Sequence, residues 1–192
     1  TATKMVTLLP DLVSRLDEPL ADPSLVPTHL LSKFVRQHVT VALGGDGGDE
    51  LLMGYPTFSA HAPAVLAEKV PSAIRQHILR PIVEALPVSD KNWSLDFKLK
   101  RFLAGLHYPK FDRHFVWIGG THPSLHSNVL EPATYAAADQ NPFDDVQRIL
   151  KGWRYSGTDD LAVLTMLYSR MYLAEGVLQK VDRATMAYGL ES

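Results

Sequence analysis

The sequence predicts a mainly helical α/β domain, or a piece of one, with a parallel strand at about residues 38–43. Three observations lead to this prediction. Apolar residues recur at helical spacing along most of the 192 residues, "HVTVAL" is the one convincing run of β-branched and apolar residues, and a glycine-rich loop follows that run directly. With 46% hydrophobic residues, the chain is long enough to bury a core.

Two helices are expected before the strand. The first covers about residues 5–16, where Pro10 is early enough to be tolerated near a first turn. It ends at "DEPLADPSLVP", in which three prolines enforce a loop. The second covers residues 28–37 and presents Leu30, Leu31, Phe34 and Val35.

A further helix is expected directly after the glycine loop, because Asp49 and Glu50 would complement the dipole of its first turn. Residues 58–86 read as two short helices broken at Pro71. Residues 93–106 read as another helix, with four apolar residues directed inward: Leu95, Leu99, Phe102 and Leu103.

The last third of the chain divides into a loop and a long helix. Residues 119–142 are rich in Gly, Pro, His and Asn, which favours an irregular connection. Residues 158–186 carry apolar residues at helical spacing. Thr158 and Asp159 are the expected caps, and Gly176 is a candidate break.

Composition excludes several classes of function. Nineteen basic and 21 acidic residues give a formal charge of −2, so no global field favours nucleic acid or an anionic membrane. No apolar run approaches the ~18 to 20 residues of a membrane helix, and the absence of cysteine excludes disulfides and thiolate sites. We expect a cytoplasmic protein with no nucleic-acid or membrane partner. Because the chain starts at Thr1 and stops at "AYGLES", we interpret it as an excised piece.

Two other features are interpreted as ordinary. His122 and His126 have i, i+4 spacing, but Pro123 lies between them, which favours loop histidines over a helical metal-ligand pair. Residues 91–117 interleave basic and aromatic side chains, and balancing acids favour an amphipathic helix over a nucleic-acid surface.

The stretch "VALGGDGGDELLMGY" admits three interpretations. A calcium-binding nonapeptide needs tandem copies, and only one copy is present. The GGDE turn of cyclic-dinucleotide synthases needs a hairpin between strands, whereas the following residues have a helical pattern. A phosphate-cradling loop between a strand and a helix requires what is present, although a tight turn with capping aspartates remains the plain alternative.

In the phosphate interpretation, glycines let the backbone approach a polyphosphate and offer N–H groups to it. Asp46 and Asp49 could hold Mg²⁺, which favours one or two carboxylates plus phosphate oxygens. Near the other end, Lys180 and Arg183 share one helix face. The candidate loop positions are Gly44, Gly45, Gly47 and Gly48.

Together, "DEPLADPSLVPTHLLSKFVRQHVTVALGGDGGDELLMGY" and "VLQKVDRATMAYGLES" resemble the synthetase domain of glutamine-dependent asparagine synthetases and their relatives, which include β-lactam synthetases. The resemblance runs from about residue 8 to the end of the chain. It implies an adenine-nucleotide α-hydrolase-like (ATP pyrophosphatase) fold, of which residues 1–192 form the latter part. The family's Ser-Gly-Gly-x-Asp-Ser pyrophosphate loop and its N-terminal glutaminase domain are absent from this sequence.

The resemblance also implies an activity. Family members use ATP and Mg²⁺ to adenylate a carboxylate, here expected to be aspartate, and transfer it to ammonia derived from glutamine, giving asparagine, AMP and pyrophosphate. A related amidotransferase, a β-lactam synthetase-like enzyme acting on another acid, and a non-catalytic nucleotide-binding relative are the alternatives. We expect the piece alone to be inactive, and a homodimer is possible for the parent protein.

The resemblance assigns roles to individual residues. Gly44 and Gly45 match the Ser-Gly that contacts ATP, with glycine in place of the serine. Asp46 matches the acidic residue beside the adenylate, Asp49 the aspartate that helps to hold Mg²⁺-pyrophosphate, and Lys180 the lysine that neutralises the leaving pyrophosphate. Glycines 47 and 48 complete the ATP loop. Asp17 and Glu18 match the family's Asp-Glu-Pro without a mechanistic role, and Asp182 and Arg183 are expected to position the helix.

Overall fold

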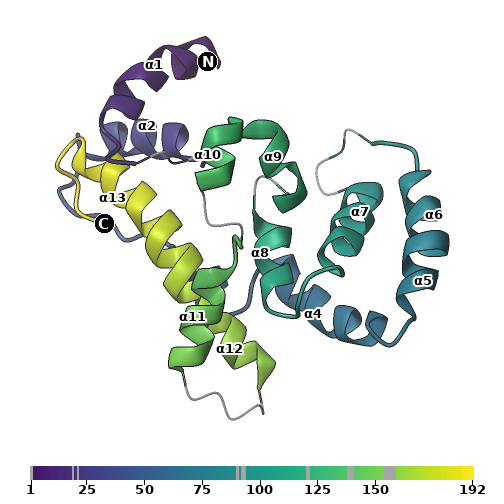
Figure 1. Ribbon diagram of the computed structural model, residues 1–192. Coiled ribbons are helices and arrows are strands. Elements are labelled where there is room, and N and C mark those ends of the chain that lie inside the picture. The colour runs from purple at the N-terminus through teal and green to yellow at the C-terminus, as the bar shows by residue number, and fades with distance from the viewer. Residues whose placement is uncertain are drawn as a thin grey trace. The chain divides into compact units, whose positions relative to one another are not determined.

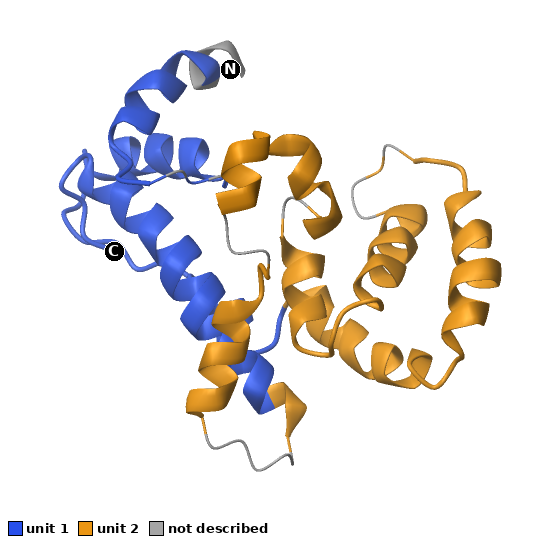
Figure 2. Ribbon diagram, viewed as in Figure 1, with its two compact units in different colours: residues 1–54, 162–192 blue, residues 55–161 orange. Residues whose placement is uncertain are grey.

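The computed structural model describes residues 2–18, 20, 22–89, 91, 94–119, 122–137, 141–153 and 159–192. It divides into two compact units (Figure 2). Unit 1 comprises Thr1–Gly54 and Ala162–Ser192, and unit 2 comprises Tyr55–Leu161. All regular elements in the described residues are helical (Figure 1).

Unit 1 is built from helices at the two ends of the chain. A continuous helix begins as α12 (Asp160–Leu167), whose first two residues belong to unit 2, and it continues into unit 1 through a π-helical segment and α13. Figure 1 shows α13 beside α2. The other elements of unit 1 are α1 (Ala2–Ser14), α2 (Leu25–Val35), α3 (Gly48–Leu51), η3 (Tyr168–Leu178) and α13 (Gln179–Met186).

The core of unit 1 joins α1, α2 and α13 through Leu12, Leu25 and Ala184. α2 buries Leu25, His29 and Ser32, which recur at i, i+4 and i+7 on one helix face. The predicted set of apolar residues on the buried face of this helix is wrong, since Leu31 and Phe34 are exposed. The face of α2 that is buried is the one that packs against α13. This face can include the polar His29 because its Nε2 has a hydrogen-bonding partner, the hydroxyl of Tyr188 at 2.7 Å.

The predicted strand at residues 38–43 is not confirmed. The described residues contain one isolated parallel bridge, between Val41 and Glu191. In it, the N–H of Ala42 donates to the carbonyl of Glu191 at 2.9 Å, and the N–H of Glu191 donates to Thr40 at 3.0 Å. A strand needs a continuous ladder of partners, so β-branched composition alone does not produce one.

Pro10 also departs from expectation. α1 begins at Ala2, which places Pro10 inside the helix rather than near its first turn. Proline has no N–H, so the carbonyl of Val6 loses its intrahelical donor. The helix nevertheless continues to Ser14, since its Leu12 is anchored in the core of unit 1.

Unit 2 is a set of short helices. The predicted break at Pro71 is confirmed, because α4 ends at Ala67 and the next helix begins after the proline. Residues 119–142 were expected to be irregular, yet their described part contains three short helical segments. The elements are α4 (Pro56–Ala67), α5 (Ser72–Ile74), η1 (Arg75–Leu79), α6 (Arg80–Glu84), α7 (Leu95–Gly105), α8 (Asp112–Ile118), η2 (Pro123–Leu125), α9 (His126–Val129), α10 (Pro132–Ala137) and α11 (Asp144–Gly152).

The core of unit 2 forms where α4, α7 and α8 meet, around Ala64, Leu106 and Trp117. Gly105 lets this packing occur, since a Cβ there would collide with the Trp117 indole. The expected inward face of α7 is partly wrong: Leu95 is exposed, whereas Gly105, ten residues on, is buried.

The long helix is capped as expected at Asp159, whose Oδ1 accepts the N–H of Leu161 at 2.9 Å, while Thr158 lies outside the described residues. Gly176 lies within the π-helical η3 and does not break the helix.

By length and composition, Asp160–Met186 is the one helix in the described residues that could cross a membrane. Packing covers part of its apolar surface, since Val163, Leu164 and Leu167 are buried. One such helix, which also carries the buried cation Lys180, does not indicate a membrane protein.

A buried polar network lies in unit 2. His114 is fully buried, and its Nε2 lies 3.1 Å from Nδ1 of His61. The Nε2 of His61 lies 3.3 Å from Asp160, which also accepts a 2.7 Å hydrogen bond from Lys110. Burial, followed by the positive charges of His61 and Arg113, lowers the pKa of His114 to about 3.

Acidification is therefore expected to destabilise the protein through His114. The folded state keeps this imidazole neutral down to about pH 3, whereas the unfolded chain binds a proton below the ordinary pKa of 6.5. The unfolded state binds more protons between these values, so stability falls on acidification by up to about 1.4 kcal/mol per pH unit.

Urea unfolding between about pH 7 and pH 5 measures this effect. The variant His114→Gln should show a shallower dependence on pH, because its amide can replace Nε2 without titrating. Equal pH dependence in the two proteins would contradict this assignment.

Candidate functional site

The glycine loop has a backbone that requires glycine at position 47. Gly47 has a φ of +90°, in the left-handed region, and immediately precedes α3. It is buried, and a Cβ at this position would lie 3.3 Å from the side chain of Leu173 in η3. The loop closes with a hydrogen bond from the N–H of Gly48 to the carbonyl of Gly45, at 3.2 Å. α3 has only four residues, so its dipole is a small part of any attraction for an anion.

Gly44 and Asp46 are in close contact. A Cβ at position 44 would lie 2.9 Å from Oδ2 of Asp46. Glycine instead of serine therefore leaves room for this carboxylate to lie against the backbone. A serine at this position would displace the Asp46 side chain, which is exposed and can rotate.

The turn that follows α3 brings Gly54 back against Asp49, in the first turn of that helix. The N–H of Gly54 donates to the Asp49 carbonyl at 2.8 Å. A Cβ at Gly54 would collide with the Asp49 carboxylate and lie 3.2 Å from its Cα. The turn between them includes Met53 at a φ of 59°, and the neighbouring Glu50 is buried. The Asp49 side chain itself is exposed, so it is available to solvent and ligands.

Lys180 is buried in an ion pair that sequence reasoning did not identify. Its Nζ lies 3.2 Å from Oδ2 of Asp22, and 11% of the lysine side chain is exposed. The other Asp22 oxygen accepts the N–H and the hydroxyl of Ser24 at 2.8 and 2.7 Å. Burial acts to raise the Asp22 pKa, but the bonds from Ser24 and the charge of Lys180 outweigh it, so the pKa is lowered.

A second ion pair joins the same two segments. Arg183, one turn after Lys180, pairs with Asp17. Both of these side chains are more exposed than the Asp22–Lys180 pair. Asp17 and Asp22 both lie in "DEPLADPS", the stretch to which sequence analysis gave only a loop role. The motif was the one feature of the sequence that drew attention to the segment around Asp22. Sequence spacing could not show that Asp22 pairs with Lys180, because Lys180 lies on a helix far away in the sequence.

The predicted site residues form two groups within unit 1. The first is the glycine loop with Asp46 and Asp49, and the second is Lys180 with Asp22. Among the described residues of unit 1, Lys180 pairs with Asp22 and forms no ion pair with Asp46 or Asp49. The groups are nevertheless linked, because the loop contacts Leu173, seven residues before Lys180 on the same continuous helix. That spacing is a rise on the order of 10 Å, which a polyphosphate and a lysine side chain can bridge.

The donor set fits Mg²⁺ only together with phosphate. No cluster of three His, Cys, Asp or Glu side chains suited to a metal occurs among the described residues. Asp46 lies on the glycine loop and Asp49 in the first turn of α3, and both residues are exposed. Magnesium keeps several waters and commonly takes one or two carboxylates plus substrate phosphates, so these two residues suit a metal that arrives with a nucleotide.

Comparison with known proteins shows the family to which the chain belongs. The family model for asparagine synthase matches residues 1–192. The chain belongs to the asparagine synthase family. It is 36% identical over 185 residues to glutamine-hydrolysing asparagine synthetase 1 of Bacillus subtilis. The match covers 95% of this chain and 27% of that protein. It is 42% identical over 171 residues to the putative glutamine-hydrolysing asparagine synthetase 2 of Methanocaldococcus jannaschii, covering 88% of the chain and 30% of that protein.

This asparagine synthase family chain thus spans less than a third of the length of these relatives. No solved structure matches it significantly.

Replacing Asp22 by asparagine should destabilise the protein by about 2 kcal/mol or more, because it leaves the largely buried charge of Lys180 without its partner. The matched control is Asp17→Asn, which breaks a more exposed pair and should cost less than about 1 kcal/mol. Urea unfolding of both variants tests this difference. Equal costs would mean that the burial of Lys180 has no energetic consequence.

Replacing Gly54 by alanine should lower the free energy of unfolding by about 1 to 3 kcal/mol, because the added methyl group collides with Asp49 and its backbone. Gly152→Ala is the control, since nothing lies within 4 Å of a Cβ there. Thermal unfolding of the two variants measures the difference. An unchanged stability of Gly54→Ala would show that the turn after α3 is free to shift.

Proposed function

We propose that this chain is the latter part of the synthetase domain of a glutamine-hydrolysing asparagine synthetase-type ligase. The parent protein would adenylate a carboxylate with ATP, aspartate being the proposed acid, and transfer the acyl group to ammonia released from glutamine. Asparagine, AMP and pyrophosphate would be the products. The observation that supports the proposal is that the glycine loop packs against Leu173, on the same continuous helix that carries Lys180.

Lys180 is the proposed electrostatic catalyst. Adenylation places negative charge on the oxygen that links the α-phosphate to the leaving pyrophosphate, and a fixed ammonium group stabilises that charge. Lysine has three N–H donors, of which Asp22 engages one. The ion pair therefore orients the ammonium group without consuming its capacity to donate to a phosphate. In this proposal Asp22 is a positioning residue and Lys180 is the catalytic one.

The glycine loop is the proposed ATP-binding element. Gly44, Gly45, Gly47 and Gly48 let the backbone approach the phosphates, and the left-handed turn at Gly47 sets the direction of the chain there. Asp49 is the proposed ligand of Mg²⁺, and Asp46 is proposed to lie beside the adenylate. The metal, when bound with the nucleotide, would supply charge neutralisation on the phosphates.

The remaining partners follow from the same proposal. A glutaminase domain elsewhere in the parent chain would supply ammonia, and the missing phosphate-binding loop would complete the ATP site. The length of the relatives is consistent with further domains. The parent protein is proposed to be cytoplasmic, without nucleic-acid or membrane partners, and a homodimer is compatible with this assignment.

Replacing Lys180 by alanine in the full-length protein should lower the rate of pyrophosphate release on the order of 10²–10³-fold, because a charge aimed at the leaving group is lost. Pyrophosphate release with aspartate and Mg·ATP measures the effect. Lys69→Ala, which removes an exposed lysine in unit 2, is the control and should retain full activity.

A second candidate function, nucleotide sensing without catalysis, rests on the replacement of the family's serine by Gly44. In that case, Lys180→Ala would leave nucleotide affinity nearly unchanged, and the unmodified protein would release no pyrophosphate with aspartate or any other acid. That combination would contradict the synthetase proposal.

A further inference from the structure

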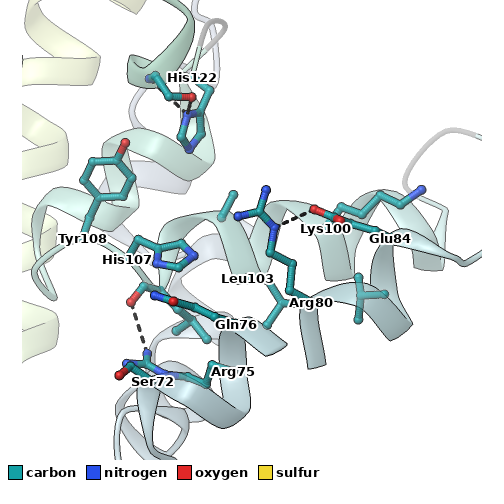
Figure 3. A pocket seen from close by; sticks show the side chains of 14 residues that line it. Ser72, Arg75, Gln76, Arg80, Glu84, Lys100, Leu103, His107, Tyr108 and His122 are labelled. Atoms are coloured by element: carbon teal, nitrogen blue, oxygen red, sulfur yellow. Dashed lines mark hydrogen bonds and ion pairs between the residues drawn. The ribbon is translucent and has the colours of Figure 1, made fainter. Parts of the chain in front are cut away.

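The cations that line a pocket of unit 2 are engaged by the fold itself. The pocket has a volume of about 800 Å³ and lies between the segment formed by α5, η1 and α6 and the helix α7 (Figure 3). Arg80 pairs with Glu84 at 2.6 Å, and Arg75 donates to the carbonyl of Leu106 at 3.2 Å. Lys100 forms an ion pair within α7. Because each cation already has a contact within the fold, the three do not converge on a ligand.

In unit 1, the chain turns back directly after α13. Gly189 has a φ of +63°, in the left-handed region that favours glycine. Its N–H donates to the carbonyl of Met186 at 3.0 Å, and the N–H of the buried Leu190 donates to that of Thr185 at 3.1 Å. A left-handed residue commonly ends an α-helix with hydrogen bonds of this kind. We call residues 188–191 the α13 turn.

The α13 turn is held by α2. The hydroxyl of Tyr188 lies 2.7 Å from Nε2 of His29, and the centroids of the two rings are 4.7 Å apart. Nδ1 of His29 is buried without a partner, so Tyr188 is the one hydrogen-bond partner of this imidazole among the described residues. Two turns further along α2, Nε of Arg36 donates to the carbonyl of Gly189 at 3.0 Å. The turn is therefore fixed by contacts to its side chain and to its backbone.

The α13 turn in its own right holds the backbone that leads into the glycine loop. The N–H of Glu191 donates to the carbonyl of Thr40, and the carbonyl of Glu191 accepts the N–H of Ala42, two residues before Gly44. Residues 38–46 are exposed apart from the half-buried Ala42, so side-chain packing does little to fix them. In the described backbone between Thr40 and Gly44, the hydrogen bonds are the two to Glu191. The position of this segment therefore depends on the turn.

The glycine loop is thus held from both sides of Lys180. Leu173, which precedes Lys180 on the continuous helix, lies against Gly47 inside the loop. Glu191, which follows the same helix, bonds to the backbone before the loop. Two supports on one rigid element keep the loop at a fixed distance from the lysine, and sites that are held in this way are preorganised.

We infer that the α13 turn positions the glycine loop relative to Lys180, with Tyr188 and Gly189 as the positioning residues. The inference rests on the proposed function, in which the loop and Lys180 contact one nucleotide. A displaced turn would move the loop while Lys180 keeps its ion pair with Asp22. A displacement of about 1 Å between groups that act on the same substrate can cost as much as about 10²-fold in rate.

Gly189→Ala in the full-length protein tests the conformation of the turn. Nothing lies within 4 Å of a Cβ at this position, so the substitution is opposed by its left-handed φ alone. We expect the KM for Mg·ATP to rise about fivefold, because strain in the turn is passed to the loop, and the KM for aspartate to stay unchanged. Gly189→Asn should restore most of the loss, since asparagine adopts this region more readily than alanine.

Tyr188→Phe tests the contact with α2 without straining the backbone. It removes the hydroxyl that bonds to His29, and it should also raise the KM for Mg·ATP and not that for aspartate. Ser32→Ala is the matched control, because it removes a hydroxyl from the same buried face of α2 that bonds within the helix, to the carbonyl of Thr28. This control should leave both KM values unchanged.

Amide hydrogen exchange separates this inference from the proposed function. The amides of residues 42–48 should exchange faster in Gly189→Ala and Tyr188→Phe than in the unmodified protein, and at the same rate in Ser32→Ala. Unchanged exchange in both turn variants would overturn the inference, as would an unchanged KM for Mg·ATP or an equal rise in both KM values. If the unmodified protein releases no pyrophosphate, the synthetase proposal fails, and the exchange of residues 42–48 still decides whether the turn positions the loop.

Discussion

The ion pair between Asp22 and Lys180 is the interaction on which the arrangement of unit 1 depends. It joins a loop near the start of the chain to a helix near its end, and both charges are largely withdrawn from water. Such a pair is favourable only when the surrounding geometry is fixed, and here three features fix it. Ser24 satisfies the second oxygen of Asp22, Ala184 brings α13 close to α2, and Leu12 fills the junction. The position of Lys180 is thus set by packing as well as by charge.

Local rules predicted the features that depend on local sequence. The turn at Gly47, the first-turn acids of α3, the break at Pro71 and the cap at Asp159 each follow from the conformational preferences of a few neighbouring residues. Features that depend on distant partners were predicted less well. The buried face of α2 is chosen by α13, and the run around Val41 has only Glu191 to pair with. Hydrophobic periodicity identifies a helix, but the helix that packs against it decides which side is buried.

The candidate site divides in the same way. The glycines, Asp46 and Asp49 were predicted from the sequence because the chemistry of phosphates selects those residue types, and Lys180 was predicted from the resemblance to the family. The role of Asp22 was not predictable, since it depends on a contact between distant parts of the chain.

The π-helical segment η3 contains Leu173, which supports the glycine loop, and ends two residues before Lys180, which pairs with Asp22. A wide turn accommodates one more residue than an α-helical turn, so η3 changes the angular phase of every residue that follows it. Removing a single residue from this segment, with its winding otherwise unchanged, would rotate α13 by roughly a quarter turn relative to α12. Lys180 would then face away from Asp22, although no residue of the site had changed. In this family member, the number of residues in η3 is therefore as much a determinant of the site as the identity of its side chains.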